Sequence, residues 1–433
     1  MRKLLLIGLL LVPAALLAQK PAADDEEDAP SKTGVPHGLY FKFKDRPSFR
    51  VGDTFKLDIR SKWHLDFRHF YPLKTNLDDD STFLLQRARF GIKGKVTKYF
   101  DYEAERELRR TFSETPENHP WRDVYVDFKP HSLIKLMVGK FKMPFGLEEN
   151  GAEDRLDLIS KSHTTDYLAP ARERGAMLHG DITKRLSYEA GVFRFDGEHS
   201  NIKGLPTAGR TYAARVSGEP LRYLKFLPKT IRHTYLGVAA TRGKMFQGLN
   251  GIQGQTDANF TYFDRLNVQG YRQRIGTEVA WSEGPVSVKG EYIRVSEQRK
   301  EQGIRANDVP DKISRGWYVT ATWTALGKMK SNGKEPKSGL ITGGGFGAVE
   351  LAARLDVLTF YGKSTGSIPS RSPRAATILP SSDRMWTFGP TWYLNHFVKI
   401  QANAGREFLT DIGREVAGKN VFWTGLIRLQ FAM

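Results

Sequence analysis

The chain has 433 residues and a mass of 49.0 kDa, and its 66 basic and 48 acidic residues give a formal net charge of +18. An aromatic content of 12% argues against a disordered chain. The lack of cysteine excludes a disulfide scaffold, an iron–sulfur cluster, a thiol nucleophile and a cysteine-ligated zinc site. The mean hydropathy of −0.45, with no long apolar run after residue 17, excludes a helical membrane protein but not a membrane barrel.

Residues 1–18 have the features of a secretory signal peptide. Arg2 and Lys3 precede an apolar stretch at 4–17 that is too short to span a bilayer, and cleavage is expected after Ala18. The alternative is a buried N-terminal helix. Residues 19–50 are predicted to be an acidic leader and N-terminal segment, mostly disordered, and 51–433 to form the folded domain.

The basic charge lies after the acidic run of the leader. The total of +18 becomes +20 for residues 31–433 once the two positive charges of 1–18 and the net −4 of 19–30 are set aside. A charge of this size implies an anionic partner or surface.

The segment from Asp53 to Arg68 sets the structural period. Apolar residues occupy one parity and charged residues the other over some 13 positions, which indicates a strand with one apolar and one charged face. Soluble half-buried strands usually end after about five or six residues, whereas a membrane strand needs about 9–11. The apolar positions are Phe55, Leu57, Ile59, Trp63, Leu65 and Phe67.

Sixteen such segments are predicted, although counts of 14 or 18 are alternatives. They lie near residues 54–68, 82–96, 99–110, 121–128, 133–142, 174–183, 186–196, 210–218, 231–243, 271–282, 285–296, 315–325, 346–360, 384–394, 397–409 and 420–431.

Short and long connections alternate along the chain, and the longest includes residues 143–173. Short turns at one end and long loops at the other are typical of an outer-membrane barrel, and an even strand number puts both termini on the periplasmic side. The fold class is therefore all-β, a transmembrane antiparallel barrel whose apolar face meets lipid and whose charged face lines a lumen. The alternative is a soluble all-β protein of two sandwiches, which leaves the alternation of connections unexplained.

Several stretches between residues 82 and 196 resemble the phosphate-selective porin O and P family of Gram-negative outer membranes. They are Phe83-Leu84-Leu85-Gln86-Arg87-Ala88-Arg89-Phe90, Gly94-Lys95-Val96, Phe100-Asp101-Tyr102, Trp121-Arg122-Asp123-Val124-Tyr125-Val126, Val138-Gly139-Lys140-Phe141-Lys142-Met143-Pro144-Phe145-Gly146-Leu147-Glu148, Leu168-Ala169-Pro170-Ala171-Arg172-Glu173-Arg174-Gly175 and Tyr188-Glu189-Ala190-Gly191-Val192-Phe193.

The resemblance implies a 16-stranded homotrimeric barrel in which the long loop 143–173 folds into each pore as a constriction. It also implies a preference for anions, with phosphate or polyphosphate as the solute. The sequence departs from the family at Gln86, where the strand-two motif often has an arginine.

Basic residues of the lumen face are the candidate anion-binding side chains. Arginine suits phosphate because its planar guanidinium forms bidentate hydrogen bonds, whereas lysine acts as a point charge. The candidate pore-lining residues are Arg60, Lys62, Arg87, Arg89, Lys93, Lys142, Arg172, Arg174, Arg272 and Arg274.

For each of these residues the alternative is a salt bridge to a lumen carboxylate. Asp58, Asp66, Asp101, Glu103, Glu105 and Glu107 are available for that. Basic loops could instead bind lipopolysaccharide phosphates outside the barrel.

No motif indicates catalysis, a cofactor or a metal. The ten histidines show no HExxH or paired metal spacing, and a nucleic-acid partner is not expected because the charges lie on strand faces behind a signal peptide. The predicted function is passive diffusion of small anions. The alternatives are a weakly selective porin of the same fold and a closed barrel that acts as a receptor or enzyme.

Overall fold

The computed structural model describes residues 38–43, 45–71, 81–109, 120–197, 208–330, 335–340, 345–362, 378–411 and 420–433. The predicted signal peptide and the leader up to residue 37 lie outside these ranges. Within them, no helix has both the length and the apolar character needed to cross a membrane.

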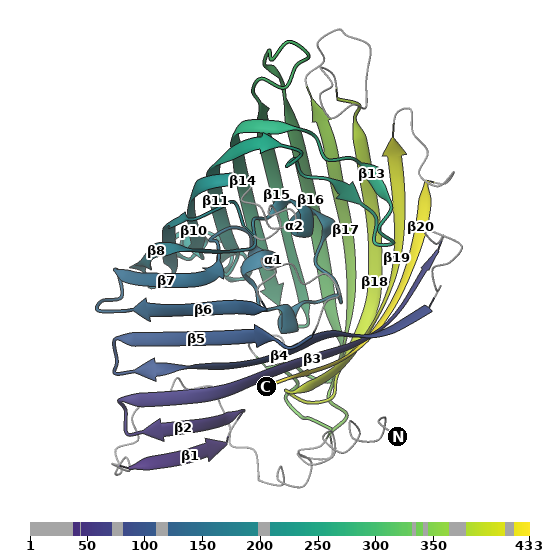
Figure 1. Ribbon diagram of the computed structural model, residues 1–433. Helices are drawn as coiled ribbons and strands as arrows, with labels where there is room; N and C mark the ends of the chain where they lie inside the picture. The colour runs from purple at the N-terminus through teal and green to yellow at the C-terminus, as the bar shows by residue number, and fades with distance from the viewer. Residues whose placement is uncertain are drawn as a thin grey trace, which may run out of the picture.

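Sixteen antiparallel strands form a closed barrel (Figure 1). The ring closes where β20 pairs with β3, with Leu429 opposite Leu65. All sixteen predicted segments are confirmed. The strands are β3 (Phe55–Tyr71), β4 (Ser81–Val96), β5 (Phe100–Glu107), β6 (Trp121–Phe128), β7 (Lys135–Lys142), β8 (Arg172–Thr183), β9 (Leu186–Phe193), β10 (Ala208–Gly218), β11 (Tyr235–Gly248), β14 (Val268–Glu283), β15 (Val286–Arg299), β16 (Val309–Leu326), β17 (Ala348–Gly362), β18 (Ser381–Tyr393), β19 (Val398–Asp411) and β20 (Val421–Ala432).

A hairpin that was not predicted precedes the barrel. It consists of β1 (Leu39–Phe43) and β2 (Pro47–Val51), within the segment expected to be mostly disordered. β2 pairs with the first residues of β3, from Phe55 to Asp58, whereas β20 pairs with β3 from Lys62 to Tyr71. β3 therefore pairs with β2 along its first part and with β20 along its later part.

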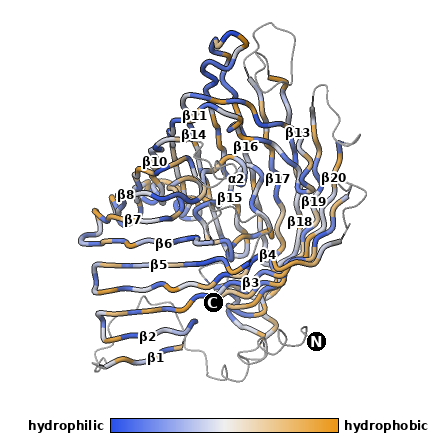
Figure 2. The backbone as a smooth tube through the Cα atoms, in the orientation of Figure 1, coloured by the Kyte–Doolittle hydropathy of each residue, from blue (hydrophilic) through white to orange (hydrophobic). Residues whose placement is uncertain are grey.

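The two faces of the wall differ in polarity as the alternation predicts. On β3, Trp63 and Phe67 point outward and are exposed, while Asp58, Lys62 and Asp66 point inward and are buried. Figure 2 shows the same alternation of hydrophilic and hydrophobic residues along other strands. An apolar exterior around a charged interior is the polarity that a lipid bilayer requires of a barrel.

A bulge shapes β4 beside the family motif. The register with β3 shifts between the pairs His64–Arg87 and Leu65–Leu85, which leaves Gln86 as the extra residue. A bulge changes the face on which the following residues lie. It allows Leu85 to face outward while Arg87 faces the lumen, and the Gln86 side chain accepts a hydrogen bond from Arg109 (3.3 Å).

Most connections at the end of the barrel where the C-terminus lies are short (Figure 1). One longer connection there contains the 3-10 helix η4 (Pro220–Tyr223) and α3 (Lys229–Arg232). The long loops that shape the lumen belong to the opposite end.

Candidate functional site

Loop 143–171, which joins β7 to β8, folds into the barrel. It contains α1 (Leu147–Asn150), the 3-10 helix η2 (Glu153–Arg155) and α2 (His163–Leu168), and Figure 1 shows α1 and α2 within the ring of strands. The Ile159 amide donates a hydrogen bond to Asn403 Oδ1 on β19 (2.7 Å), and Arg428 on β20 donates to the Ile159 carbonyl (2.8 Å). The loop thus reaches the far wall and narrows the lumen, as predicted.

Glu153 of this loop is the centre of a cluster of arginines. It forms ion pairs with Arg87 and with Arg89 (2.7 Å), and Arg172 lies 3.9 Å away. Burial alone would raise the pKa of Glu153, but the guanidinium groups of Arg87, Arg89 and Arg172 outweigh it and hold that pKa well below its ordinary value. The cluster fixes the loop to the wall formed by β4 and β8.

Lys62 holds the neighbouring part of the loop. Its ammonium group lies 3.3 Å from Asp154 and 3.5 Å from Glu105 on β5. Lys62 and Arg89 are both buried, so these two candidates act mainly by fixing the loop.

Arg60 on β3 and Lys93 on β4 share one carboxylate. Arg60 forms an ion pair with Glu103, and Lys93 lies 3.1 Å from the other oxygen of Glu103. Tyr125 also donates a hydrogen bond to Glu103 (2.9 Å). Arg60 and Lys93 are therefore both paired with a lumen carboxylate, which was the alternative considered for each candidate residue.

Lys142 and Arg172 turn toward the loop at the ends of their strands. Lys142 donates to the backbone carbonyls of Glu149 (2.5 Å) and Gly151 (2.6 Å). Arg172 forms two hydrogen bonds with Asp123 of β6 (3.0 and 2.8 Å). Lys142 therefore binds the loop itself, whereas Arg172 binds the neighbouring strand β6.

Arg174 does not line the lumen, which corrects the prediction. Arg174 lies on β8, which begins at Arg172. Arg174 is exposed on the same side of β8 as Ala176 and Leu178, which is the outward face. Alternation along β8 places Arg174 on that face, whereas Arg172, at the first position of the strand, turns toward Asp123.

Arg272 and Arg274 lie inside the barrel but are fully buried. Asp196 lies between them, 2.6 Å from each guanidinium, and Arg272 also pairs with Glu297 (2.5 Å). Arg274 Nε donates to the Leu168 carbonyl of the inward loop (2.8 Å). These two arginines therefore position loops and present no accessible cation to a passing solute.

A second loop, residues 249–267, also folds inward. It carries the short strands β12 (Gly254–Gln255) and β13 (Thr261–Phe263). Phe263 stacks on Phe360 of β17 with ring centroids 4.5 Å apart, and Phe260 packs on Phe422 of β20 at 5.1 Å. This placement could not be predicted, because the aromatic residues of the loop follow no strand or helix period.

Inward cations of β15, β17 and β20 also belong to the site, and the candidate set did not include them. Lys289 forms an ion pair with Asp157 (2.5 Å), Arg354 binds the Ser160 and Lys161 carbonyls (3.0 and 3.1 Å), and Arg428 pairs with Asp66 (2.6 Å). Alternation places each of them on the lumen face, so the signal was present in the sequence.

In several lumen ion pairs the cation is the more accessible partner. The side chain of Lys93 is 44% exposed against 8% for Glu103, that of Arg87 is 20% against 6% for Glu153, and that of Lys289 is 21% against 6% for Asp157. In the pairs of Lys62 with Asp154 and of Arg172 with Asp123, the carboxylate is the more accessible partner. Water in the lumen thus meets positive charge at the first three pairs.

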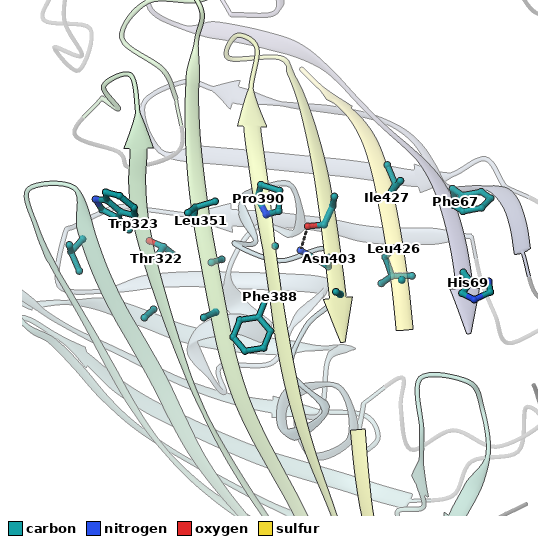
Figure 3. A pocket seen from close by; sticks show the side chains of 18 residues that line it. Phe67, His69, Thr322, Trp323, Leu351, Phe388, Pro390, Asn403, Leu426 and Ile427 are labelled. Carbon is teal, nitrogen blue, oxygen red and sulfur yellow. Dashed lines mark hydrogen bonds between the residues drawn. The ribbon is translucent and has the colours of Figure 1, made fainter. Parts of the chain in front are cut away.

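An apolar groove of about 850 Å³ lies on the other side of the wall, along the outward face of β15–β20 and β3. Figure 3 shows Trp323, Leu351, Phe388 and Ile427 around it. Small residues such as Ala402 form its floor. It belongs to the apolar exterior and is no part of the path through the lumen.

The closed 16-stranded barrel, its apolar exterior, its charged interior and its inward loop define an outer-membrane porin. The sequence model described as "Phosphate-selective porin O and P" matches residues 55–433, and the chain belongs to this family. The expected location in the outer membrane and the family resemblance are thereby confirmed.

Solved structures share the fold at low sequence identity. A loop L8 deletion mutant of OmpT, an outer membrane protein of Vibrio cholerae, has a TM-score of 0.57 at 10% identity over 88% of this chain and 100% of that chain. The trimer form of in-vitro folded OmpT has a TM-score of 0.55 at 11% identity, with the same coverage. The outer membrane channel DcaP of Acinetobacter baumannii has a TM-score of 0.54 at 8% identity over 88% and 98%. No curated protein matches the sequence.

Proposed function

We propose that the protein is a passive channel for small anions, with inorganic phosphate or polyphosphate as the first candidate solute. The observation that carries the proposal is the order within the lumen ion pairs, where Lys93, Arg87 and Lys289 are more accessible than their carboxylates. An anion in the lumen meets the cation first, because the carboxylate lies behind it.

The chemistry of these side chains supports the choice of solute. A pore selects anions by raising their local concentration and by offering donors that replace lost hydration. Arg60, Arg87 and Lys93 follow one side of the lumen on adjacent strands β3 and β4. Two guanidiniums that can bind phosphate in a bidentate manner and one ammonium thus line the proposed path.

The test is the reversal potential of single channels in a planar bilayer under a chloride gradient, followed by titration with phosphate. We expect anion-selective current in the wild type and a block by phosphate at concentrations well below that of chloride. Substitutions Arg60→Gln, Arg87→Gln and Lys93→Gln are expected to shift the reversal potential toward the value of an unselective pore.

Lys300→Gln is the matched control, because it removes the same charge from an exposed loop pair with Asp308 outside the lumen. It is expected to leave the reversal potential unchanged. A wild-type channel that prefers cations, or variants that behave like Lys300→Gln, would refute the proposal of an anion path. A stable anion current without phosphate block would retain the anion path and refute phosphate as the solute.

A closed barrel is the second candidate, and the apolar packing of the second inward loop favours it. Phe260 and Phe263 fill space inside the ring against Phe422 and Phe360. A barrel with no conductance, from folded protein, would favour a receptor or an enzyme over a channel.

We also propose a homotrimer, export directed by residues 1–18, and termini on the periplasmic side. Support for the trimer comes from the trimer form of OmpT, which shares the fold. Support for the orientation comes from the short connections at the end where the C-terminus lies.

A further inference from the structure

Four side chains from four separate segments meet where loop 143–171 reaches the barrel wall. His163 begins α2, Asp383 lies on β18, Glu407 lies on β19 and Asp257 belongs to the second inward loop. His163 Nδ1 lies 2.7 Å from Asp383 Oδ2 and 3.8 Å from Glu407 Oε1, and His163 Nε2 lies 2.9 Å from Asp257 Oδ1. We refer to these four residues as the His163 cluster.

Two oxygen atoms of the cluster have no hydrogen-bond partner among the described residues. They are Asp383 Oδ1 and Glu407 Oε1, and both side chains are only 1% exposed. An unsatisfied oxygen in a buried carboxylate is costly, because the group has lost its water without gaining a donor. These two oxygens therefore indicate a missing partner.

The surrounding groups do not supply that partner. Asp356, the next carboxylate, accepts a hydrogen bond from the Thr164 hydroxyl (2.6 Å). Arg354 is engaged by Glu148 and by loop carbonyls, and Arg68 by Asp66. A single imidazole thus lies within ion-pair distance of Asp257, Asp383 and Glu407.

We propose that His163 Nδ1, Asp383 and Glu407 bind a divalent transition-metal ion, with Zn²⁺ and Mn²⁺ as the ions to test. One ligand atom from each of the three lies within 4.8 Å of the others, and imidazole with carboxylates is a donor set that suits these ions. Asp257 takes the orienting role, because a metal-bound histidine usually donates its other ring N–H to a carboxylate.

Space beside His163 and Asp257 is not lined by Asp383 or Glu407. A small cavity of about 10 Å³ is lined by residues that include His163, Asp257 and Thr387, and the Thr387 hydroxyl has no partner within the described chain. This is close to the room that one water molecule needs.

Such an ion would join the inward loop, two wall strands and the second inward loop at one point. Its role is structural, and it does not depend on which solute the channel passes. The sequence offers no metal-binding spacing, because Asp383 and Glu407 lie 220 and 244 residues from His163.

The test is metal analysis of the full barrel, stripped with EDTA and refolded with one equivalent of Zn²⁺ or Mn²⁺. We expect close to one ion per chain and a higher thermal unfolding temperature with metal than without it. Asp383→Asn and Glu407→Gln are expected to abolish stoichiometric binding, and Asp257→Asn to weaken it about 10–100-fold.

Asp127→Asn is the matched control. Asp127 pairs with His179 (2.9 Å) in the same manner, but that pair has a single carboxylate. It is expected to bind metal like the wild type. Absence of stoichiometric metal in the refolded wild type, or equal binding by Asp383→Asn and the wild type, would overturn the proposal. A metal-independent rise in unfolding temperature for Glu407→Gln would assign the cluster to a shared proton and overturn it as well.

Discussion

A single carboxylate, Glu153, joins the inward loop to three arginines on two strands. Its removal would leave Arg87, Arg89 and Arg172 with one fewer counter-charge in a buried place. A buried ion pair adds little net stability compared with an apolar pair, but the loss of one partner is expensive. Glu153 therefore controls both the position of the loop and the charge beside the pore.

Glu153→Gln is expected to lower the free energy of unfolding by about 3–5 kcal/mol, because it removes the carboxylate that pairs with Arg87 and takes one counter-charge from the buried Arg89 and Arg172. It is also expected to increase the preference for anions. Unfolding in detergent and the reversal potential measure the two effects. Asp308→Asn, in an exposed pair with Lys300, should change neither, and an unchanged stability for Glu153→Gln would contradict the assigned role.

Asp196 makes a prediction about pH. Burial tends to raise the pKa of Asp196, but Arg274 and Arg272 outweigh it and hold the pKa below its ordinary value. A carboxylate with a lowered pKa contributes stability above its unfolded pKa of about 3.9 and loses it as the pH falls toward the folded value.

The stability difference between wild type and Asp196→Asn is therefore expected to be constant from pH 8 to about 5 and to shrink below about pH 4. Unfolding curves over this range would measure it. A difference that instead disappears between pH 6 and 8 would show that another group is responsible.

At the residue scale, alternation predicted which side chains face the lumen but not their partners. Arg60 and Arg89 face inward, and their partners Glu103 and Glu153 lie 43 and 64 residues away in the sequence. Pairing at such separations depends on barrel register and on the path of a loop. Neither can be read from the local period, so the sequence could not separate an accessible cation from a buried one.

Among the elements, the second inward loop, residues 249–267, fills part of the lumen with apolar side chains. Its apolar side chains cover Phe360 and Phe422 without taking part in the wall. The strands that it connects, β11 and β14, are paired with each other over most of their length. The loop can therefore be shortened without removing a strand.

Replacement of residues 253–265 by a short glycine–serine link is expected to raise single-channel conductance, because side chains leave the lumen. A similar shortening of loop 300–308, whose charged pair is exposed, serves as the control and should leave conductance unchanged. Equal conductance in both variants would mean that loop 143–171 alone sets the narrowest point.

The strands could be predicted and the inward loops only in part. Apolar and polar residues alternate over residues 55–68, which is long enough to predict a strand, and in the structure that strand continues to Tyr71. The placement of loop 143–171 followed from the family resemblance. Loop 249–267 and the hairpin β1–β2 carry no comparable pattern, because short strands and aromatic contacts depend on the barrel around them.

For the whole molecule, the net positive charge predicts an effect of salt. Electrostatic attraction into the lumen is screened over about 10 Å at 0.1 M salt and about 3 Å at 1 M. Anion selectivity is therefore expected to fall when both sides of the membrane are raised in salt at a constant concentration ratio. Reversal potentials measured across such a series would contradict the prediction if they did not change.

The strand β3 has a consequence for the order in which the chain can assemble. Its hydrogen bonds with β20 join residues 362 positions apart, as Asp66 and Arg428 illustrate. Closing a loop of that length costs about 5 kcal/mol of chain entropy by the logarithmic relation, so this seam forms after the local hairpins. Meanwhile β2 occupies only Phe55–Asp58 and leaves the rest of the β3 edge open. Until β20 pairs with it, β3 is therefore covered only by β2, along its first four residues.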